Sequence, residues 1–200
     1  DSKLVAIADD SIPRHITSFV MVDYNTVCAS DRFGNIFTLR LSETISDEID
    51  NDPTGVSVVF EKKYLNGANY RLEKLTEYHL GDVITGMEKT NMIKTGREVV
   101  AYTTLLGRIG ILIPFLKKKD IEFFQVLEIH MRAHLQSLSG RDNLSYRSSF
   151  IPIKSCIDGD LCEQYIYLSV ENQQKIANIL DKPIKDVAKK IEDMRNRSAF

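Results

Sequence analysis

The chain has 200 residues, a formal net charge of −2 and 43% hydrophobic residues, which suits one or two globular domains with their own cores. The balanced charge excludes a global field that selects nucleic acid or an anionic membrane, and no apolar run approaches the ~20 residues of a membrane span. The three widely spaced cysteines, Cys28, Cys156 and Cys162, argue against a disulfide framework and for reduced intracellular thiols.

The first part of the chain predicts antiparallel strands joined by tight turns. A short apolar run at 4–8 indicates an edge strand or a buried strand. Beyond Pro13, alternating and β-branched residues predict three strands that form a meander. Gly34 and Asn35 both tolerate positive φ and mark the second turn. The strands are predicted over 16–22, 26–30 and 36–41, and the turns at 23–25 and 31–35.

An acidic stretch at 42–57 interrupts this pattern. Between Ser42 and Pro53 it holds five acidic residues and no basic one. This composition predicts a solvated surface loop, with an acidic docking loop for a basic partner as the alternative. The overlapping stretch 56–65 is ambiguous between a strand and irregular structure.

A fourth strand is predicted over 72–80. The strand pattern then restarts, with strands predicted over 83–90, 99–104 and 109–115 and a polar loop at 91–97. Gly34-Asn35-Ile36 aligns with Gly107-Arg108-Ile109. The chain therefore holds two copies of a strand–strand–glycine turn–strand unit. Repeated four-stranded meanders with a glycine near the turn into the third strand are typical of β-propeller blades.

Two blades cannot bury their faces alone, since a propeller needs at least ~4 blades. The second copy also lacks an obvious fourth strand. We therefore expect the remaining blades to come from other parts of a longer chain. The predicted fold is mainly β with α: residues 1–116 form the last blades of an incomplete WD40-like β-propeller, and residues 117–200 form a C-terminal α-helical domain.

The hydrophobic period becomes helical after the basic run 117–119. Asp120 is the predicted N-cap of the first helix. Residues 141–150 predict a polar segment with one turn of helix, and 151–153 an extended segment. Further helices are predicted to start at Asp158, at Ser169 and at Asp181 and Pro183. The predicted inner faces are Phe123, Phe124, Leu127, Met131 and Leu135; Leu161, Tyr165 and Leu168; Ile176, Ala177 and Leu180; and Ile184, Val187, Ala188 and Ile191.

Asp158-Gly159-Asp160 is a pattern that suggests a metal or phosphate site. A calcium loop needs further oxygen ligands and a bidentate glutamate at its twelfth position, where this chain has Ser169. We instead predict that Asp158 caps a helix by accepting an N–H from Asp160 or Leu161. On this interpretation Asp158→Ala costs about 1 kcal/mol.

Other candidates for chemistry are weaker. His130 and His134 lie one helical turn apart, but Met131 stands where the zinc-protease pattern requires glutamate. A metal hydrolase that uses Asp158, Asp160 and His130 remains the alternative.

No nucleophile elbow, phosphate loop or dinucleotide fingerprint occurs. We therefore predict no catalytic, cofactor-binding or metal-binding residues. The basic run 117–119 and the basic end of the last helix are predicted to be solvated faces, and phosphate contact is the alternative.

Several motifs, in this order, resemble the C-terminal region of the triple-β-propeller family that includes the large damaged-DNA-binding subunit and the large cleavage-and-polyadenylation subunit. They are Tyr78-His79-Leu80-Gly81, Gly107-Arg108-Ile109-Gly110, Ser145-Tyr146-Arg147-Ser148 and Ile157-Asp158-Gly159-Asp160-Leu161. Within the family, segments 30–36, 52–55, 65–68 and 190–200 are similar to the branch found in splicing factor SF3b. The chain departs from its relatives at His15, where they carry a large aromatic residue such as Trp, and at Tyr146, which replaces Phe.

The resemblance assigns structural roles to a set of family-signature residues. They are Gly34, Asn35, His79, Gly81, Gly107, Gly110, Arg147, Asp158, Gly159, Asp160 and Leu161.

The resemblance also implies a nuclear, non-catalytic scaffold of SF3b in the U2 small nuclear ribonucleoprotein, which supports branch-site recognition and spliceosome assembly. Expected partners are the HEAT-repeat subunit and the small subunit of SF3b, other U2 proteins, and the remaining propeller segments of the same protein. RNA contact is expected to be indirect or minor, and no cofactor or membrane is implied. Sister branches imply the alternative, a propeller adaptor of a ubiquitin ligase or of an mRNA 3′-end processing complex.

Overall fold

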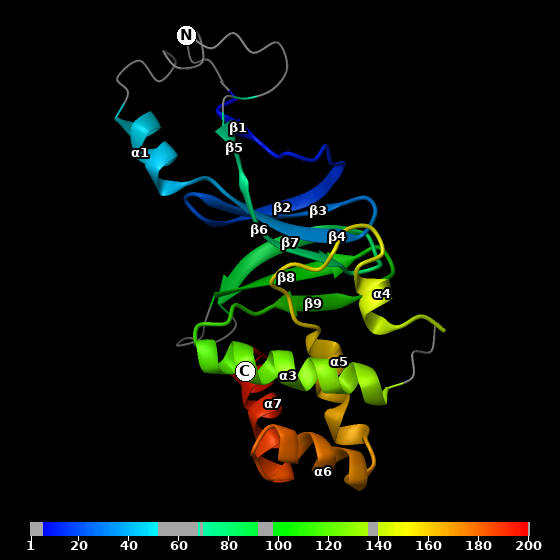
Figure 1. Cartoon of the computed structure of the whole chain (residues 1–200). Helices are drawn as coiled ribbons and strands as arrows, with labels where there is room; N and C mark the ends of the chain where they lie inside the picture. The colour runs from blue at the N-terminus through cyan, green and yellow to red at the C-terminus, as the bar shows by residue number, and fades with distance from the viewer. Residues whose placement is uncertain (1–5, 52–67, 69, 92–97, 136–139, 200) are drawn as a thin grey trace.

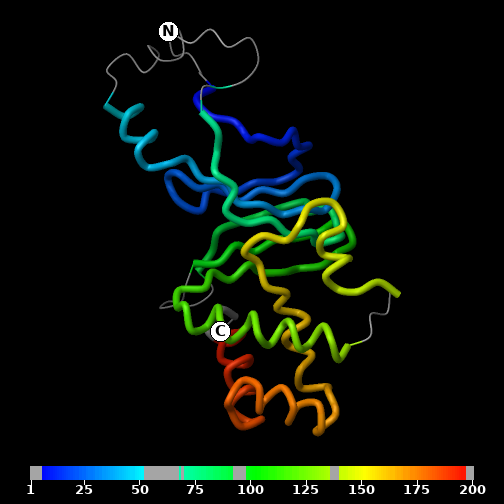
Figure 2. The backbone as a smooth tube through the Cα atoms, viewed as in Figure 1, coloured from blue at the N-terminus to red at the C-terminus, as the bar shows by residue number. Residues whose placement is uncertain are grey.

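Two antiparallel sheets are stacked on one another, and most of the helices lie beyond the second sheet (Figure 1). The computed structural model describes residues 6–51, 68, 70–91, 98–135 and 140–199. The chain runs from the first sheet through the second sheet to α3 (Lys118–His134), returns beside the first sheet, where Lys154 bridges Glu77, and then enters the last helices (Figure 2). Within the described residues, no helix is long and apolar enough to cross a membrane.

The first sheet confirms the predicted meander and the fourth strand predicted over 72–80. Its strands lie in the order β2-β3-β4-β6, with antiparallel neighbours. They are β2 (Ile16–Asp23), β3 (Thr26–Asp31), β4 (Asn35–Arg40) and β6 (Glu73–His79). A short parallel pair, β1 (Ala8–Asp9) and β5 (Tyr70–Arg71), lies beside this sheet. The strand predicted at 4–8 begins outside the described residues.

The second sheet has three strands in the order β7-β8-β9, namely β7 (Ile84–Asn91), β8 (Glu98–Thr104) and β9 (Ile109–Leu112). β9 ends before the predicted limit at Phe115, and Pro114 cannot donate a ladder hydrogen bond there. Most of the loop predicted at 91–97 lies outside the described residues.

An apolar core joins the two sheets. The sheets approach most closely along their first strands, β2 and β7. The core consists of Cys28, Ile36, Leu80 and Ile84, flanked by Val20, Val22, Tyr78, Met87, Tyr102 and Leu112. All three cysteines are free.

The prediction of an acidic loop is wrong for Glu43–Asp50, which form helix α1. Ile45 and Ile49 lie one turn apart and are half-buried, so the helix has an apolar side despite its charge. Buried Ser46 donates its hydroxyl to Asn25 Oδ1 at 2.9 Å, which ties α1 to the β2–β3 turn. Composition alone does not detect this spacing. Residues 52–57 of the predicted loop, and the ambiguous stretch 56–65, lie outside the described residues.

The C-terminal region is helical, as predicted. Its elements are α3 (Lys118–His134), α4 (Asn143–Arg147), α5 (Gly159–Glu163), the 3₁₀ turn η1 (Gln164–Tyr167), α6 (Val170–Ile179) and α7 (Ile184–Ala199). The predicted N-cap Asp120 is wrong, because the N-cap position of α3 is three residues earlier, at Lys117. The helix continues into the basic run, and Asp120 lies in its first turn, where a negative charge favours the helix dipole.

The predicted inner faces meet in one helical core. Ser169 caps α6 through Asn172 N, as predicted. Tyr165, Leu127, Met131 and Val187 are completely buried. The core consists of Phe123, Phe124, Leu127, Met131, Leu161, Cys162, Tyr165, Ile176, Ala177, Val187 and Ile191.

Candidate functional site

Buried polar groups connect the first sheet to the helices. We call this set the polar junction and define it as Asp31, Asn35, His79, Glu128, Arg147 and Asp158. It spans the β3–β4 turn, the end of β6, α4, α5 and α3, and it contains four of the family-signature residues.

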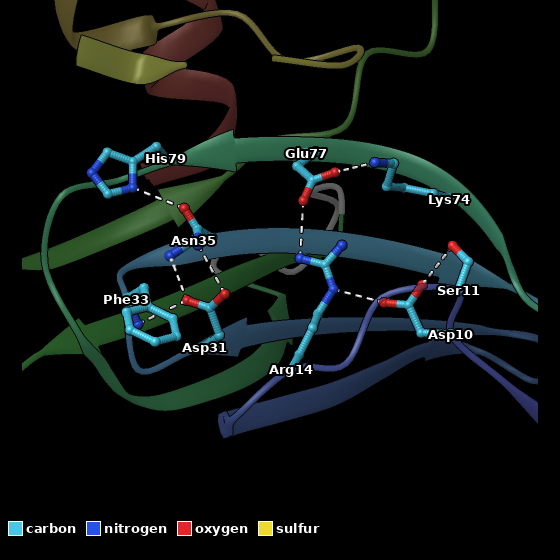
Figure 3. A network of polar contacts seen from close by, with 9 residues as sticks. All are labelled: Asp10, Ser11, Arg14, Asp31, Phe33, Asn35, Lys74, Glu77 and His79. Carbon is cyan, nitrogen blue, oxygen red and sulfur yellow. Dashed lines mark hydrogen bonds and ion pairs between the residues drawn. The ribbon is translucent and has the colours of Figure 1, made fainter. Parts of the chain in front are cut away.

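The junction begins at the β3–β4 turn (Figure 3). The buried Asp31 carboxylate accepts hydrogen bonds from the backbone N–H of Phe33 at 2.9 Å and of Asn35 at 3.0 Å. It also accepts one from Asn35 Nδ2 at 2.8 Å. Gly34 has φ +79°, and a Cβ there would lie 2.9 Å from the backbone nitrogen of Asp82. Only glycine meets both requirements.

The Asn35 side chain is hydrogen-bonded to His79 at the end of β6. Asn35 Oδ1 lies 2.8 Å from His79 Nδ1, so this imidazole nitrogen is the donor (Figure 3). The ring of His79 also contacts the rings of Tyr146 and Phe150, with centroids 5.6 and 5.1 Å away. Burial and the nearby Arg147 charge lower the pKa of His79 below its ordinary value. The imidazole is therefore neutral near pH 7.

Arg147 at the end of α4 joins the sheet to α5. Its Nε donates to Asp158 Oδ2 at 2.8 Å, and its Nη1 donates to the Leu80 carbonyl at 2.9 Å. Helix α4 lies close to the end of β6 because Gly81, with φ +85°, leaves room for the Tyr146 side chain. A Cβ at Gly81 would lie 1.7 Å from the Tyr146 hydroxyl oxygen.

Asp158 is the N-cap of α5, which confirms the prediction. Its Oδ1 accepts the backbone N–H of Leu161 at 3.1 Å, and its Oδ2 also accepts from Asn143 Nδ2 at 3.1 Å. Burial raises the pKa of the Asp158 carboxyl, but the Arg147 charge and these hydrogen bonds outweigh it and hold the pKa below its ordinary value. Both oxygens are thus engaged by protein donors, while Asp160 is exposed in the first turn of α5.

Sequence reasoning missed Glu128 of α3. Its buried Oε1 accepts the backbone N–H of Asp158 at 2.9 Å and pairs with Arg132 Nη2 at 2.9 Å. One signal was available in the sequence: Glu128 lies one turn after Phe124 and next to Leu127, on the apolar side of the predicted helix. A carboxylate at such a position requires a buried partner.

A second polar cluster on the first sheet was also missed. Arg14 Nε pairs with Asp10 at 2.6 Å and its Nη1 with Glu77 at 2.9 Å (Figure 3). Its guanidinium also lies 3.8 Å from the centroid of the Phe37 ring. Lys74 also contacts Glu77. Arg14 and Glu77 are far apart in sequence, so no local pattern indicates their contact, whereas the Asp10–Arg14 and Lys74–Glu77 pairs are four and three residues apart. This cluster covers the opposite face of the first sheet from the intersheet core.

Two signature glycines lie elsewhere, in the β8–β9 hairpin. Gly107 has φ +82° with open space around it, whereas a Cβ at Gly110 would lie 2.2 Å from the Tyr102 ring. In the part of the chain that is described, no group of three or more His, Cys, Asp or Glu side chains is placed to hold a metal ion. Since the charged groups of the junction are engaged with one another, the arrangement is suited to fixing the helices against the sheets.

Comparisons with known proteins show the family of the chain. Residues 1–167 match the family model described as the CPSF A subunit region. The chain is 44% identical over 200 residues to splicing factor 3B subunit 3 of Danio rerio, covering 100% of this chain and 16% of that protein. It is 46% identical over 197 residues to the probable splicing factor 3B subunit 3 of Dictyostelium discoideum, covering 98% of this chain and 16% of the relative.

A fungal relative has a similar match. The pre-mRNA-splicing factor RSE1 of Mycosarcoma maydis is 45% identical over 195 residues, again covering 98% of this chain and 16% of the relative. The chain thus spans only a small part of the curated relatives that it matches. The family match contains every signature residue, which confirms the resemblance seen in the motifs, and the chain belongs to the CPSF A subunit family.

Proposed function

We propose that this chain is part of a nuclear, non-catalytic scaffold subunit of SF3b, which acts in pre-mRNA splicing within the U2 small nuclear ribonucleoprotein. The observation that carries the proposal is the 40–46% identity, over nearly the whole chain, to proteins named as splicing factor 3B subunit 3 or as pre-mRNA-splicing factor. The polar junction is consistent with such a role, because its groups bind one another.

Residues 1–116 are the last blades of a β-propeller, and residues 117–200 are its C-terminal helical domain. Supporting this, the two antiparallel sheets pack face to face and come closest along β2 and β7, as neighbouring blades do where they converge on a propeller axis. On the outer face of β2, Phe19 is 63% exposed and Met21 is 51% exposed. The remaining propeller segments of the longer protein cover this face and supply a fourth strand beside β9.

Partner proteins bind at the end of the sheets where the β3–β4, β6–β7 and β8–β9 turns lie (Figure 1). These turns adjoin one another, because Gly34 packs against Asp82 and Leu105 N donates to the Val83 carbonyl at 2.8 Å. Large apolar side chains are exposed there, as at a protein interface. They are Phe33, Leu105, Leu106, Ile109 and Phe150.

Affinity purification of the full-length protein tests the proposed function. We expect the HEAT-repeat subunit, the small subunit of SF3b and U2 proteins to co-purify, and depletion to cause intron retention. Recovery of ubiquitin-ligase or 3′-end processing subunits in their place would assign the chain to a sister branch of the family. Recovery of neither set would overturn the scaffold function.

A further inference from the structure

The fold brings together two basic segments that are distant in sequence. The run 117–119 opens α3, and the lysines around 182–190 lie on the α6–α7 connection and α7. Between them is a cavity of about 340 Å³, to which four lysines, three aspartates and one methionine contribute. The lining residues are Lys117, Asp120, Lys182, Asp186, Lys189, Lys190, Asp193 and Met194.

The lysines of this cavity differ in their partners. Lys190 Nζ pairs with Asp120 at 2.9 Å and lies 4.3 Å from the centroid of Phe123, so one wall is held in place. Lys117, Lys182 and Lys189 are exposed, and none forms an ion pair with a described residue. Three ammonium groups are therefore available on a chain whose net charge is −2.

We propose that this cavity binds a phosphate group carried by a protein partner, as phosphoserine or phosphothreonine; this rests on the scaffold function proposed above. A phosphorylated side chain carries close to two negative charges and three acceptor oxygens. The three ammonium groups supply donors from both sides of the cavity, and the pair between Lys190 and Asp120 keeps those sides together.

The lining favours a phosphorylated peptide over a nucleic acid strand. No lining residue is aromatic, so the cavity offers no surface on which bases stack. Asp186 and Asp193 repel a continuous phosphate backbone, whereas they accept hydrogen bonds from peptide N–H groups or from a basic flanking residue. A peptide that carries one phosphate and also basic residues is complementary to a cavity lined by both lysines and aspartates.

The test uses immobilised full-length protein and a peptide library with a fixed phosphoserine between randomised positions. We expect the phosphorylated library to be retained about tenfold more than the same library after phosphatase treatment, because charge-assisted hydrogen bonds to the phosphate are lost. Raising the salt concentration should reduce retention. Equal retention of the two libraries would refute the phosphate site.

Charge-reversal variants locate the site. Lys182→Glu combined with Lys189→Glu should abolish the phosphate-dependent retention. Lys175→Glu, on an exposed position of α6 outside the cavity, should leave it unchanged. Equal losses in both proteins would show that binding is not local to the cavity.

Two further measurements separate the alternatives. If a random single-stranded RNA pool binds more tightly than the phosphopeptides, and the double variant loses that binding, the cavity is a nucleic-acid site and the proposal is wrong. Recovery of the HEAT-repeat subunit is measured in parallel. If that recovery persists while phosphopeptide retention is absent, the phosphate site fails and the scaffold function stands.

Discussion

The β3–β4 turn and the β8–β9 turn have the same local design but different surroundings. In each, a side-chain oxygen accepts a hydrogen bond from the backbone N–H four residues later. Asp31 accepts from Asn35 at 3.0 Å, and Thr104 accepts from Arg108 at 3.1 Å. Each also has a positive-φ glycine that donates to the carbonyl three residues earlier at 3.1 Å.

The two turns differ in how deeply they are buried. Asp31, Gly34 and Asn35 are buried, whereas residues 105–109 are exposed. The first turn contacts the β6–β7 connection at Asp82 and reaches the helices through the polar junction. In the second turn, no described atom packs against the Cβ position of Gly107. The comparison shows that a turn conformation is a local property, while its contribution to stability depends on what packs against it.

Asp158→Ala should have the largest effect, because it breaks the junction that connects the first turn to the helices. Its side chain is 3% exposed and pairs with Arg147, so the substitution leaves a buried charge without its partner. We expect a loss of about 3–5 kcal/mol in local opening free energy, well above the 1 kcal/mol expected for a cap alone. Hydrogen exchange across β6, α4 and α5 of the full-length protein measures it.

Asp160→Ala is the matched control for this variant. Asp160 is exposed in the same helix, so the substitution should cost no more than about 1 kcal/mol, the contribution of one charge near a helix N-terminus. Equal exchange in the two variants would show that Asp158 acts as a cap only.

Gly34→Ala and Gly107→Ala compare the turns directly. Both substitutions place a side chain at positive φ, at a cost of about 1–2 kcal/mol. At Gly34 the new Cβ also meets the Asp82 backbone, which raises the total to about 3 kcal/mol or more. Exchange protection of the two turns, measured in the same full-length background, reports the difference. If the two losses match, the Asp82 backbone moves to accommodate the new Cβ, and the close approach at Gly34 adds no cost.

The pH dependence should be smaller and confined to the end of β6 and the first turn, which His79 joins. The folded-state pKa of His79 is lowered, so the unfolded chain binds a proton that the folded chain does not. Stability from this group is complete above the ordinary value of 6.5 and falls as pH decreases below it. Exchange in β6 should therefore be faster at about pH 5.5 than at about pH 7.5 after correction for intrinsic rates. His79→Gln should remove this difference, and its persistence would assign it to another group.

Leu105→Asp combined with Leu106→Asp should have the smallest effect on stability, within about 0.5 kcal/mol, because both side chains are exposed. If the second turn faces partners, the variant should nevertheless recover less of the HEAT-repeat subunit. Ile179→Asp, at a position of α6 that is 52% exposed, is the matched control. Unchanged recovery with the turn variant would remove the β8–β9 turn from the interface.

Much of the fold was predictable because its signals are local. Alternating residues indicated β2, β3, β4, β6, β7 and β8, and helical spacing indicated the inner faces of α3, α6 and α7. The failures at α1 and Asp120 have a common cause. In both cases a charged run was interpreted as lying outside a helix. Packing of apolar residues nearby, such as the pair one turn apart in α1, nevertheless stabilises the helix there.

In the candidate site, too, local features were predictable from the sequence and long-range contacts were not. The sequence alone determined that Asp158 caps a helix and that Gly34 and Gly107 form turns, since these depend on contacts within a few residues. It also determined the family, because the motifs keep their order. Only the tertiary structure decided that Asp31, His79, Arg147, Asp158 and Glu128 belong to one buried network, and that two lysine segments share a cavity. Those contacts join residues that are distant in sequence, and they form only when burial makes each polar group require a partner.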